Sequence, residues 1–288
     1  MKCLLFGASG LMGSHLIPLL EGKYQIISVK RHHVKNDGTC SIDLEKEWSS
    51  IDLPESIDSV VYLAQSEKFR SFPESAKSIF RVNTLSLLKA LNYARCAGAR
   101  TFVYASSGGV YDNTMNVCEE EAPLKPHGEL GFYLGTKMCG EIIAENYASF
   151  MNIIILRPFF VYGPGQRKDM LIPRLVNRVK NKQPIQLVGE DGLEINPTYV
   201  EDAVRAIYNA LNLNMSCKVN IGGPEVLSMR NIGEIIGHTI GKKVLFEASD
   251  GAPSRIVGSI EKMSQFLWKP QITFAEGIKR YVEYIDED

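Results

Sequence analysis

Three spaced glycines between an apolar stretch and an amphipathic one constrain the fold more than any other feature of the chain. Residues 2–6 are apolar and predict a buried strand, and residues 14–20 carry the apolar spacing of a helix. Between them stand Gly7, Gly10 and Gly13. In such a unit the glycines permit a tight turn, close approach to a pyrophosphate and close helix–strand packing, and the helix N-terminus offers N–H groups to phosphate. The pattern predicts dinucleotide binding, with a plain glycine-rich turn as the alternative.

Strand-like and helix-like segments alternate after this unit. Strands are predicted at 24–29, 41–44, 59–64, 101–105 and 153–156, and helices at 75–97 and 132–150. This alternation implies an α/β fold with a doubly wound parallel sheet and right-handed crossovers. The less regular last third predicts helices at 171–179, 200–211, 228–240, 259–267 and 274–285, with strands at 185–188 and 218–221. Ser228 is the expected N-cap of its helix.

The domain organisation follows from these elements. Pro and Gly residues at 163–165 mark a domain edge. We expect a dinucleotide-binding Rossmann domain at 1–165, to which 194–222 returns, and a smaller substrate-binding lobe formed by 166–193 and 223–288. The lobe would cover the carboxyl ends of the strands, where open α/β sheets bind ligands.

Composition excludes several classes of function. With 45% hydrophobic and 23% charged residues, the 288-residue chain resembles an ordinary globular protein. A net charge of −1 gives no footprint for nucleic acid or for an acidic membrane. No apolar run approaches 18 residues, and residues 1–6 are too short for a signal sequence. Six scattered cysteines show no metal-ligand spacing, so we expect reduced thiols, no metal and a cytoplasmic location.

A second pattern carries candidate catalytic groups. The predicted strand 101–105 ends in Ser106 and Ser107, and Tyr133 and Lys137 stand four apart on a predicted helix. Residues at i and i+4 share one helical face, so the lysine ammonium can lie beneath the tyrosine hydroxyl. A nearby cation and a serine hydrogen bond lower the pKa of a tyrosine from about 10 towards neutrality. The pattern therefore predicts a general acid/base.

Together these stretches resemble the extended short-chain dehydrogenase/reductases, the NAD-dependent epimerase/dehydratase family that acts mainly on nucleotide sugars. Further matching stretches lie at 43–44, 60–64, 82–83, 105–111, 156–165, 199–202 and 268–270. The resemblance implies that Tyr133 is the acid/base, that Lys137 is its partner and a ribose ligand, and that Ser107 holds the substrate oxygen. It also implies that Asp43 reaches the adenine amino group and that the Ala64 backbone contacts the cofactor. Asn83 either bridges two strands or contacts the ligand.

The implied contacts form two sets. Those expected for the cofactor are Gly7, Gly10, Leu11, Met12, Gly13, Lys30, Arg31, Asp43, Leu44, Ala64, Tyr133, Lys137 and Pro158, and those expected for the substrate are Ser107, Gly108, Tyr133, Phe160 and Arg255.

The chain also departs from the family pattern. Dehydratases of the family commonly carry an Asp-Glu pair where this chain has Gly108 and Gly109, so dehydration is disfavoured. Many nucleotide-sugar members have Asn at the position of Phe160 and Arg at that of Ile195, so the usual diphosphate clamp is missing. Arg174, Lys182 or Arg255 could replace it, or could be ordinary surface charges.

The resemblance implies a sugar epimerase or a 4-ketoreductase, most simply of a nucleotide sugar. The alternatives are a dinucleotide sensor without activity and a reductase of another small ketone. Such sensors typically lack the Tyr or the Lys, and both are present here. Helices 75–97 and 131–150 match the pair that forms a four-helix bundle in resembling proteins, which implies a homodimer.

Basic residues at the end of the second predicted strand bear on the cofactor. The strand ends beside the adenosine ribose in this fold, and Lys30 stands about where an NAD-specific protein has an acid. His32, His33 and Lys35 continue the basic run after Arg31, and the nearest acid is Asp37. We expect NADP to be favoured over NAD, the alternative being solvated side chains that tolerate both.

Overall fold

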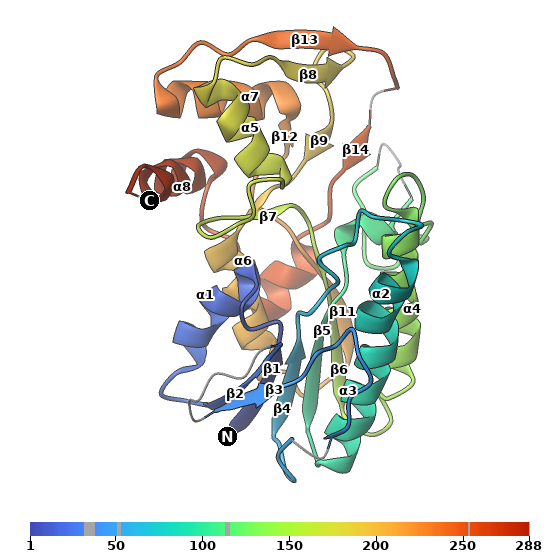
Figure 1. The fold of residues 1–288 in the computed structure, drawn as a ribbon. Helices are drawn as coiled ribbons and strands as arrows, with labels where there is room; N and C mark the ends of the chain where they lie inside the picture. The colour runs from blue at the N-terminus through green and yellow to red at the C-terminus, as the bar shows by residue number, and fades with distance from the viewer. Residues whose placement is uncertain (32–37, 51–52, 113–115, 253, 288) are drawn as a thin grey trace. The chain divides into compact units, whose positions relative to one another are not determined.

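A computed structural model describes residues 1–31, 38–50, 53–112, 116–252 and 254–287. Within them the largest element is a seven-stranded sheet of order β11-β6-β5-β4-β1-β2-β3 (Figure 1). Its strands are β1 (Lys2–Phe6), β2 (Gln25–Lys30), β3 (Thr39–Ser41), β4 (Ser59–Tyr62), β5 (Thr101–Ala105), β6 (Asn152–Pro158) and β11 (Cys217–Ile221). Neighbouring strands from β6 to β3 pair in parallel. The predicted doubly wound α/β fold is confirmed.

The strand order places a topological switch point between β1 and β4. From β1 the chain adds β2 and β3 on one side, and it then crosses to add β4, β5 and β6 on the other. Ligands of open α/β sheets bind outside the carboxyl ends of the strands at such a point. Gly7 follows β1 and Ala64 lies two residues beyond β4, so both stand there.

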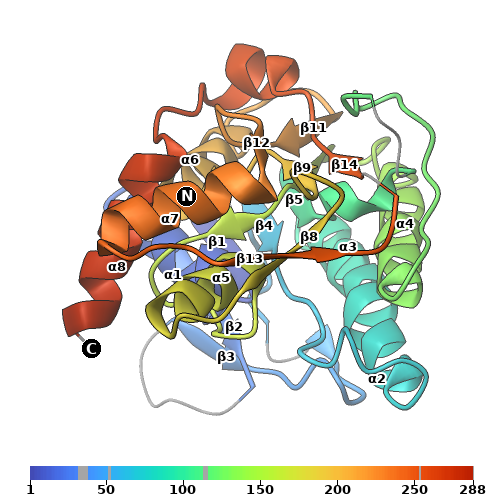
Figure 2. The same ribbon diagram turned by 90° about the horizontal axis from the view of Figure 1, so that it is seen from above.

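Helices cover the sheet because their apolar positions recur every three to four residues. They are α1 (Leu11–Leu20), α2 (Ala76–Phe80), α3 (Ser86–Cys96), α4 (Gly131–Glu145) and α6 (Val200–Ala210). Helices α3 and α4 lie side by side, as Figure 2 shows from above. On α3, Leu87, Ala90, Leu91 and Ala94 are fully buried against a core that includes Phe102 and Tyr104 of β5. This stripe at i, i+3, i+4 and i+7 is the one that an amphipathic helix directs at a core.

Two predicted elements differ in detail. The helix expected over 75–97 is interrupted by η2 (Arg81–Leu85), a π-helical segment between α2 and α3. The strand expected at 41–44 lies instead at 39–41, because the Asp43 carboxylate accepts a 3.0 Å hydrogen bond from the Glu45 N–H and forms a turn. The helix expected over 132–150 ends at Glu145.

The chain divides into two compact units. The first comprises Met1–Asp112, Pro123–Arg157 and Val204–Val219, and the second Asn113–Ala122, Pro158–Ala203 and Asn220–Asp288. The second unit contains helices α5 (Leu171–Lys180), α7 (Met229–Ile240) and α8 (Phe274–Glu287). Its strand pairs are β7 (Val161–Tyr162) with β10 (Thr198–Tyr199), β8 (Ile185–Val188) with β13 (Phe246–Ser249), and β9 (Glu194–Ile195) with β12 (Leu227–Ser228) and β14 (Arg255–Ile256).

Local sequence signals account for several features of the second unit. Ser228 caps α7 as predicted, and Asn231 completes a reciprocal capping box. Gly241 ends the same helix in the left-handed conformation. In the region of the helix expected at 259–267, the π-helical segment η4 spans Met263–Leu267.

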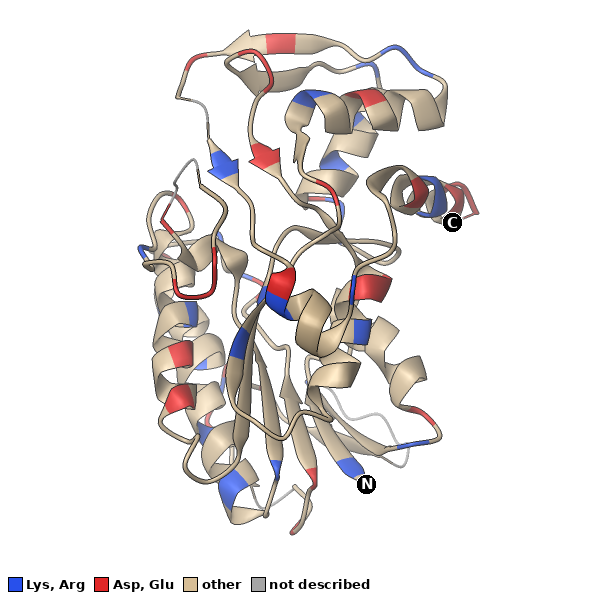
Figure 3. Ribbon diagram, turned by 180° about the vertical axis from the view of Figure 1, so that it is seen from behind, with Lys and Arg blue, Asp and Glu red and all other residues tan. Residues whose placement is uncertain are grey.

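Charged residues of both signs are interspersed along the backbone of each unit (Figure 3). None of the six cysteines forms a disulfide. Among the helices that the structure describes, none is long and apolar enough to cross a membrane. In the same residues, no group of three or more His, Cys, Asp or Glu side chains could hold a metal ion.

Candidate active site

The glycine-rich turn has the geometry that its sequence predicts. Gly7 adopts a φ of +83°, and a Cβ there would lie 2.8 Å from the Ala64 backbone nitrogen. A Cβ on Gly13 would lie 2.2 Å from the Gly7 carbonyl oxygen, so helix α1 packs directly on the turn. At Gly10, by contrast, the nearest atom to such a Cβ is 3.4 Å away. The turn thus has an open backbone face at Gly10.

Helix α1 begins next to this open face. Gly10 is its N-cap, Leu11 and Met12 are its first residues, and no described side chain caps it. Free N–H groups and the positive end of a helix dipole suit a diphosphate. The residues present therefore fit the pyrophosphate of a dinucleotide.

Ser107, Tyr133 and Lys137 come together in the first unit. Ser107 follows β5, and Tyr133 and Lys137 lie one turn apart on α4. The Lys137 Nζ is 5.9 Å from the centre of the Tyr133 ring and donates a 2.8 Å hydrogen bond to the Ala105 carbonyl. Ser107 hydrogen-bonds to Tyr133, and its oxygen accepts a 3.2 Å bond from the Gly109 N–H. The predicted spacing of the three groups therefore produces one cluster.

Burial dominates the electrostatics of this cluster. Removal from water raises the pKa of Tyr133 above its usual 10, although the Ser107 hydrogen bond acts to lower it. The expected lowering of this pKa is therefore wrong for the protein without ligands, because desolvation outweighs the hydrogen bond. Burial also lowers the pKa of Lys137 to about 7, against the opposing influence of Glu141.

A buried ionic network connects the elements that carry the cluster. Glu141 lies one helical turn beyond Lys137 and forms a two-pronged pair with Arg157 of β6, at 3.0 and 2.6 Å. Ser106 donates a 2.5 Å hydrogen bond to the same carboxylate. Arg157 also donates a 2.5 Å bond to the Tyr111 hydroxyl. The network holds the end of β5, and hence Ser107, against helix α4; sequence reasoning missed it.

Asn83 proves to be a bridge between two segments. In η2 its side chain is fully buried, and its Oδ1 accepts a 3.0 Å hydrogen bond from the Ser66 N–H. Its Nδ2 donates at 3.0 Å to Thr136 Oγ1, which in turn donates at 2.6 Å to the Tyr133 carbonyl. Asn83 thus ties the loop after β4 to the start of helix α4 rather than joining two strands.

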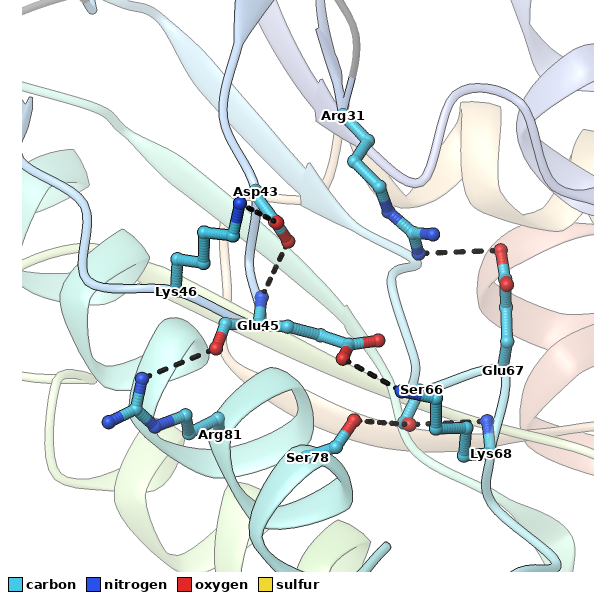
Figure 4. Close-up of polar contacts among 9 residues, drawn as sticks. All are labelled: Arg31, Asp43, Glu45, Lys46, Ser66, Glu67, Lys68, Ser78 and Arg81. Carbon is cyan, nitrogen blue, oxygen red and sulfur yellow. Dashed lines mark hydrogen bonds and ion pairs between the residues drawn. The ribbon is translucent and has the colours of Figure 1, made fainter.

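The candidate adenosine end is drawn in Figure 4. Arg31 forms a 3.4 Å ion pair with Glu67, and both side chains are exposed. Asp43 accepts from the Glu45 N–H and pairs with Lys46 at 3.5 Å.

The neighbouring residues complete this end. Lys30 ends β2, whereas Leu44 packs on the core and its carbonyl accepts from Ser86. His32, His33, Lys35 and Asp37 lie outside the described residues.

Gly108 begins a short 3₁₀ turn in the first unit, and the other remaining candidate contacts belong to the second. Phe160 adopts a φ of +44°, which is rare for a non-glycine residue and strained. It lies two residues beyond Pro158, which ends β6. Arg255 pairs with Glu194 at 3.2 Å, on neighbouring strands. Ile195, at the position where many nucleotide-sugar members of the resembling family carry arginine, is fully buried and belongs to the apolar interior.

Comparisons with known proteins fit this geometry. The model of the NAD dependent epimerase/dehydratase family matches residues 3–222. The chain is 29% identical to the uncharacterized UDP-glucose epimerase YtcB of Bacillus subtilis, over 99% of this chain and 98% of that protein. It is 28% identical to the UDP-glucuronate 4-epimerase of Thermodesulfobacterium geofontis, over 81% of this chain and 74% of that protein.

A solved structure with a similar fold comes from Bacillus cereus. It is a UDP-glucuronic acid 4-epimerase in complex with UDP-glucuronic acid and NAD. The TM-score is 0.87 at 25% identity, and the comparison covers 100% of this chain and 99% of that one.

Proposed function

Because the chain belongs to the NAD-dependent epimerase/dehydratase family, we propose that it inverts a secondary alcohol of a nucleotide sugar. The alcohol is oxidised to a ketone and the ketone is reduced from its opposite face, without net use of the cofactor. The observation that carries this proposal is the cluster of Ser107, Tyr133 and Lys137 in the unit that also contains the glycine-rich turn. Relatives named as epimerases of UDP-sugars support the substrate class.

The cofactor would be held by residues of the first unit. The glycine turn and the N-terminus of α1 would take the pyrophosphate, Asp43 the adenine amino group and Lys137 a ribose hydroxyl. NAD(P) supplies an oxidised nicotinamide ring that accepts a hydride and later returns it.

Tyr133 would move the proton of the reaction. Its hydroxyl, as phenolate, takes the proton of the substrate alcohol and returns it when the ketone is reduced. Ser107 hydrogen-bonds to Tyr133 and holds the same substrate oxygen. Positive charge on Lys137 favours the phenolate.

Two features favour epimerisation over dehydration. Elimination of water needs an acid and a base beside the catalytic hydroxyl, and Gly108 and Gly109 provide neither. A Cβ on Gly109 would lie 2.9 Å from a Leu134 methyl carbon, so the packing also leaves little room for a carboxylate there.

We assign substrate recognition to the lobe formed by 166–193 and 223–288, together with Phe160. Arg255 would release its ion pair with Glu194 and form charge-assisted hydrogen bonds to the substrate phosphates instead. Six cysteines without a disulfide suit a reducing compartment, so we place the enzyme in the cytoplasm.

The experiment is to incubate the protein with NAD and either UDP-glucose or UDP-glucuronic acid, and to follow the C4 epimer by NMR. We predict that Tyr133→Phe lowers kcat by roughly 10²–10⁴-fold while the dinucleotide still binds, because only the proton transfer is lost. Tyr93→Phe is the matched control, since this buried hydroxyl donates to Pro54 elsewhere in the unit. Near-full turnover by Tyr133→Phe would refute the assignment.

A further inference from the structure

An exposed glutamine contacts the catalytic tyrosine. Gln65 lies just beyond β4, and its Oε1 accepts a 2.8 Å hydrogen bond from the Tyr133 hydroxyl, 68 residues away in the sequence. The Tyr133 side chain is buried, whereas Gln65 is exposed. The amide therefore stands on the solvent side of the phenol.

The backbone on both sides of Gln65 is firmly held. Ala64 packs beneath Gly7, whose Cβ position lies 2.8 Å from the Ala64 nitrogen. Ser66 is buried and donates its N–H to Asn83 at 3.0 Å. Its hydroxyl lies 3.4 Å from that of Ser78, as Figure 4 shows. Fixed neighbours limit the reach of Gln65, and the hydrogen bond at Tyr133 is within that reach.

An amide matches both ionisation states of a phenol. A neutral phenol donates a proton and needs an acceptor, whereas a phenolate needs donors. The glutamine amide has an oxygen acceptor at one end and an NH₂ donor at the other, exchanged by a half-turn of its last torsion. A carboxylate can only accept, and an aliphatic side chain can do neither.

We propose that Gln65 is a positioning residue that follows the proton of Tyr133. Its oxygen accepts from the neutral phenol, and after a half-turn its NH₂ group donates to the phenolate. This inference rests on the proposed function, because it takes Tyr133 as the group that gains and loses the proton.

The other charged and titratable groups near the phenol already have partners. Lys137 donates to the Ala105 carbonyl, and Glu141 is bound by Arg157 and Ser106. Tyr104 of β5 donates to the Lys137 carbonyl. On the loop after Gln65, Glu67 pairs with Arg31 and Lys68 with Glu45. Among Ser107 and these other groups, none carries a side-chain amide. Gln65 does, and its amide is hydrogen-bonded to the Tyr133 oxygen from an exposed position.

The test follows ionisation of Tyr133 without any sugar. The protein is labelled with ¹³C at the tyrosine ζ carbon and saturated with oxidised dinucleotide. Its Tyr133 signal, identified by its absence in Tyr133→Phe, is titrated from pH 6 to 11. We expect Gln65→Glu to raise the pKa of Tyr133 by at least about one unit, because a carboxylate accepts from the phenol and repels the phenolate. Gln65→Leu should raise it less.

A matched control changes the same charge elsewhere. Gln25→Glu alters an exposed glutamine at the start of β2 and should leave the titration unchanged. With the sugar that is turned over, Gln65→Glu should lower kcat near neutral pH about tenfold, with KM unchanged and the rate restored in part as pH rises.

Two outcomes would overturn the inference. One is a titration that is the same in wild type, Gln65→Glu and Gln65→Leu, and the other is a wild-type Tyr133 that stays neutral up to pH 11 even when the protein is saturated with oxidised dinucleotide. Shifted titrations in a protein that turns over no nucleotide sugar would support the role of Gln65 and refute the proposed function instead. Turnover of a nucleotide sugar by a protein whose Tyr133 titration is the same in all variants would support the proposed function and refute the role of Gln65.

Discussion

Tyr133 and Lys137 are both buried, so each is easier to keep neutral than charged. For Lys137, the pKa of about 7 lies below the 10.4 of an unfolded chain. Between these two values the unfolded state binds more protons than the folded state, so the contribution of Lys137 to stability rises with pH. Tyr133 acts in the opposite sense above pH 10, where the unfolded chain releases a proton that the folded chain keeps.

We predict a pH-dependent difference between wild type and Lys137→Met. From pH 6 to 9 the free energy of unfolding of wild type should rise relative to that of the variant by about 2–3 kcal/mol, since the methionine has no charge to lose. Urea unfolding at several pH values measures this. Lys125→Met, which removes an exposed partner of Asp112, should track wild type. Parallel profiles for wild type and Lys137→Met would contradict the prediction.

Arg31 is one of the two residues on which the predicted preference for NADP depends. Its ion pair with Glu67 is exposed on both sides, and such pairs contribute about 0–1 kcal/mol. A charge-assisted hydrogen bond to a 2′-phosphate contributes about 1.5–3 kcal/mol. Arg31 could therefore exchange the carboxylate for a phosphate with a net gain.

The prediction from Lys30 and Arg31 is tighter binding of NADP than of NAD, by about ten- to a hundredfold. Titration of both cofactors into wild type and Lys30→Asp/Arg31→Ala measures the ratio, which the double substitution should reverse. Glu67→Gln should raise affinity for NADP, because it removes the competing carboxylate.

The same titration bears on the reaction. Equal binding of the two cofactors by wild type, or an unchanged ratio in the double variant, would show that the prediction is wrong and favour an epimerase. Preference for NADP is compatible with an epimerase, which returns the hydride that it takes, but it also fits the alternative of a net ketoreductase, since NADPH is the usual donor for reductions. Detection of the C4 epimer by NMR distinguishes the two reactions.

At the scale of elements, local sequence was enough for most strands of the sheet and for the cluster of Ser107, Tyr133 and Lys137. Apolar runs such as 101–105 and the i, i+4 spacing of Tyr133 and Lys137 are local signals. The break in the helix over 75–97 has no such local signal, because residues 81–85 contain no Gly or Pro. There the π-helical segment coincides with the bonds of Asn83 to Ser66 and Thr136, which only the folded chain brings together.

The other features that the sequence did not predict are contacts between residues remote in the chain and very short strands. Gln65 meets Tyr133 across 68 residues, and Arg157 meets Tyr111 across 46. The two-residue strands β7, β9, β10, β12 and β14 are too short to show a period of two.

The pair of Glu141 and Arg157 joins helix α4 to strand β6, with side chains only 1–2% exposed. We predict that Arg157→Met costs about 3–5 kcal/mol, because it leaves a buried carboxylate without its cation. Arg100→Met breaks an exposed pair with Asp58 in the same unit and should cost about 0–1 kcal/mol. Urea unfolding compares them, and equal losses would contradict a dominant role for the buried pair.

At the scale of the whole molecule, exposed apolar side chains remain on the helices for which the family resemblance implies a dimer contact. Phe80, Leu85 and Leu88 lie along α2, η2 and α3, and Ile142 lies on α4, each at least 40% exposed. Helix α4 contacts both α2 and α3 (Figure 2). A face of this kind becomes buried when a second copy packs against it about a two-fold axis.

We predict a homodimer of about twice 32.1 kDa at micromolar concentration, measured by light scattering. Leu88→Asp combined with Ile142→Asp should give a folded monomer, because a two-fold contact places each new carboxylate in the interface twice. Met215→Asp is the control, since this exposed side chain lies in the bend between α6 and β11. A monomeric wild type would refute the dimer, and an unchanged mass in the double variant would place the interface on another surface.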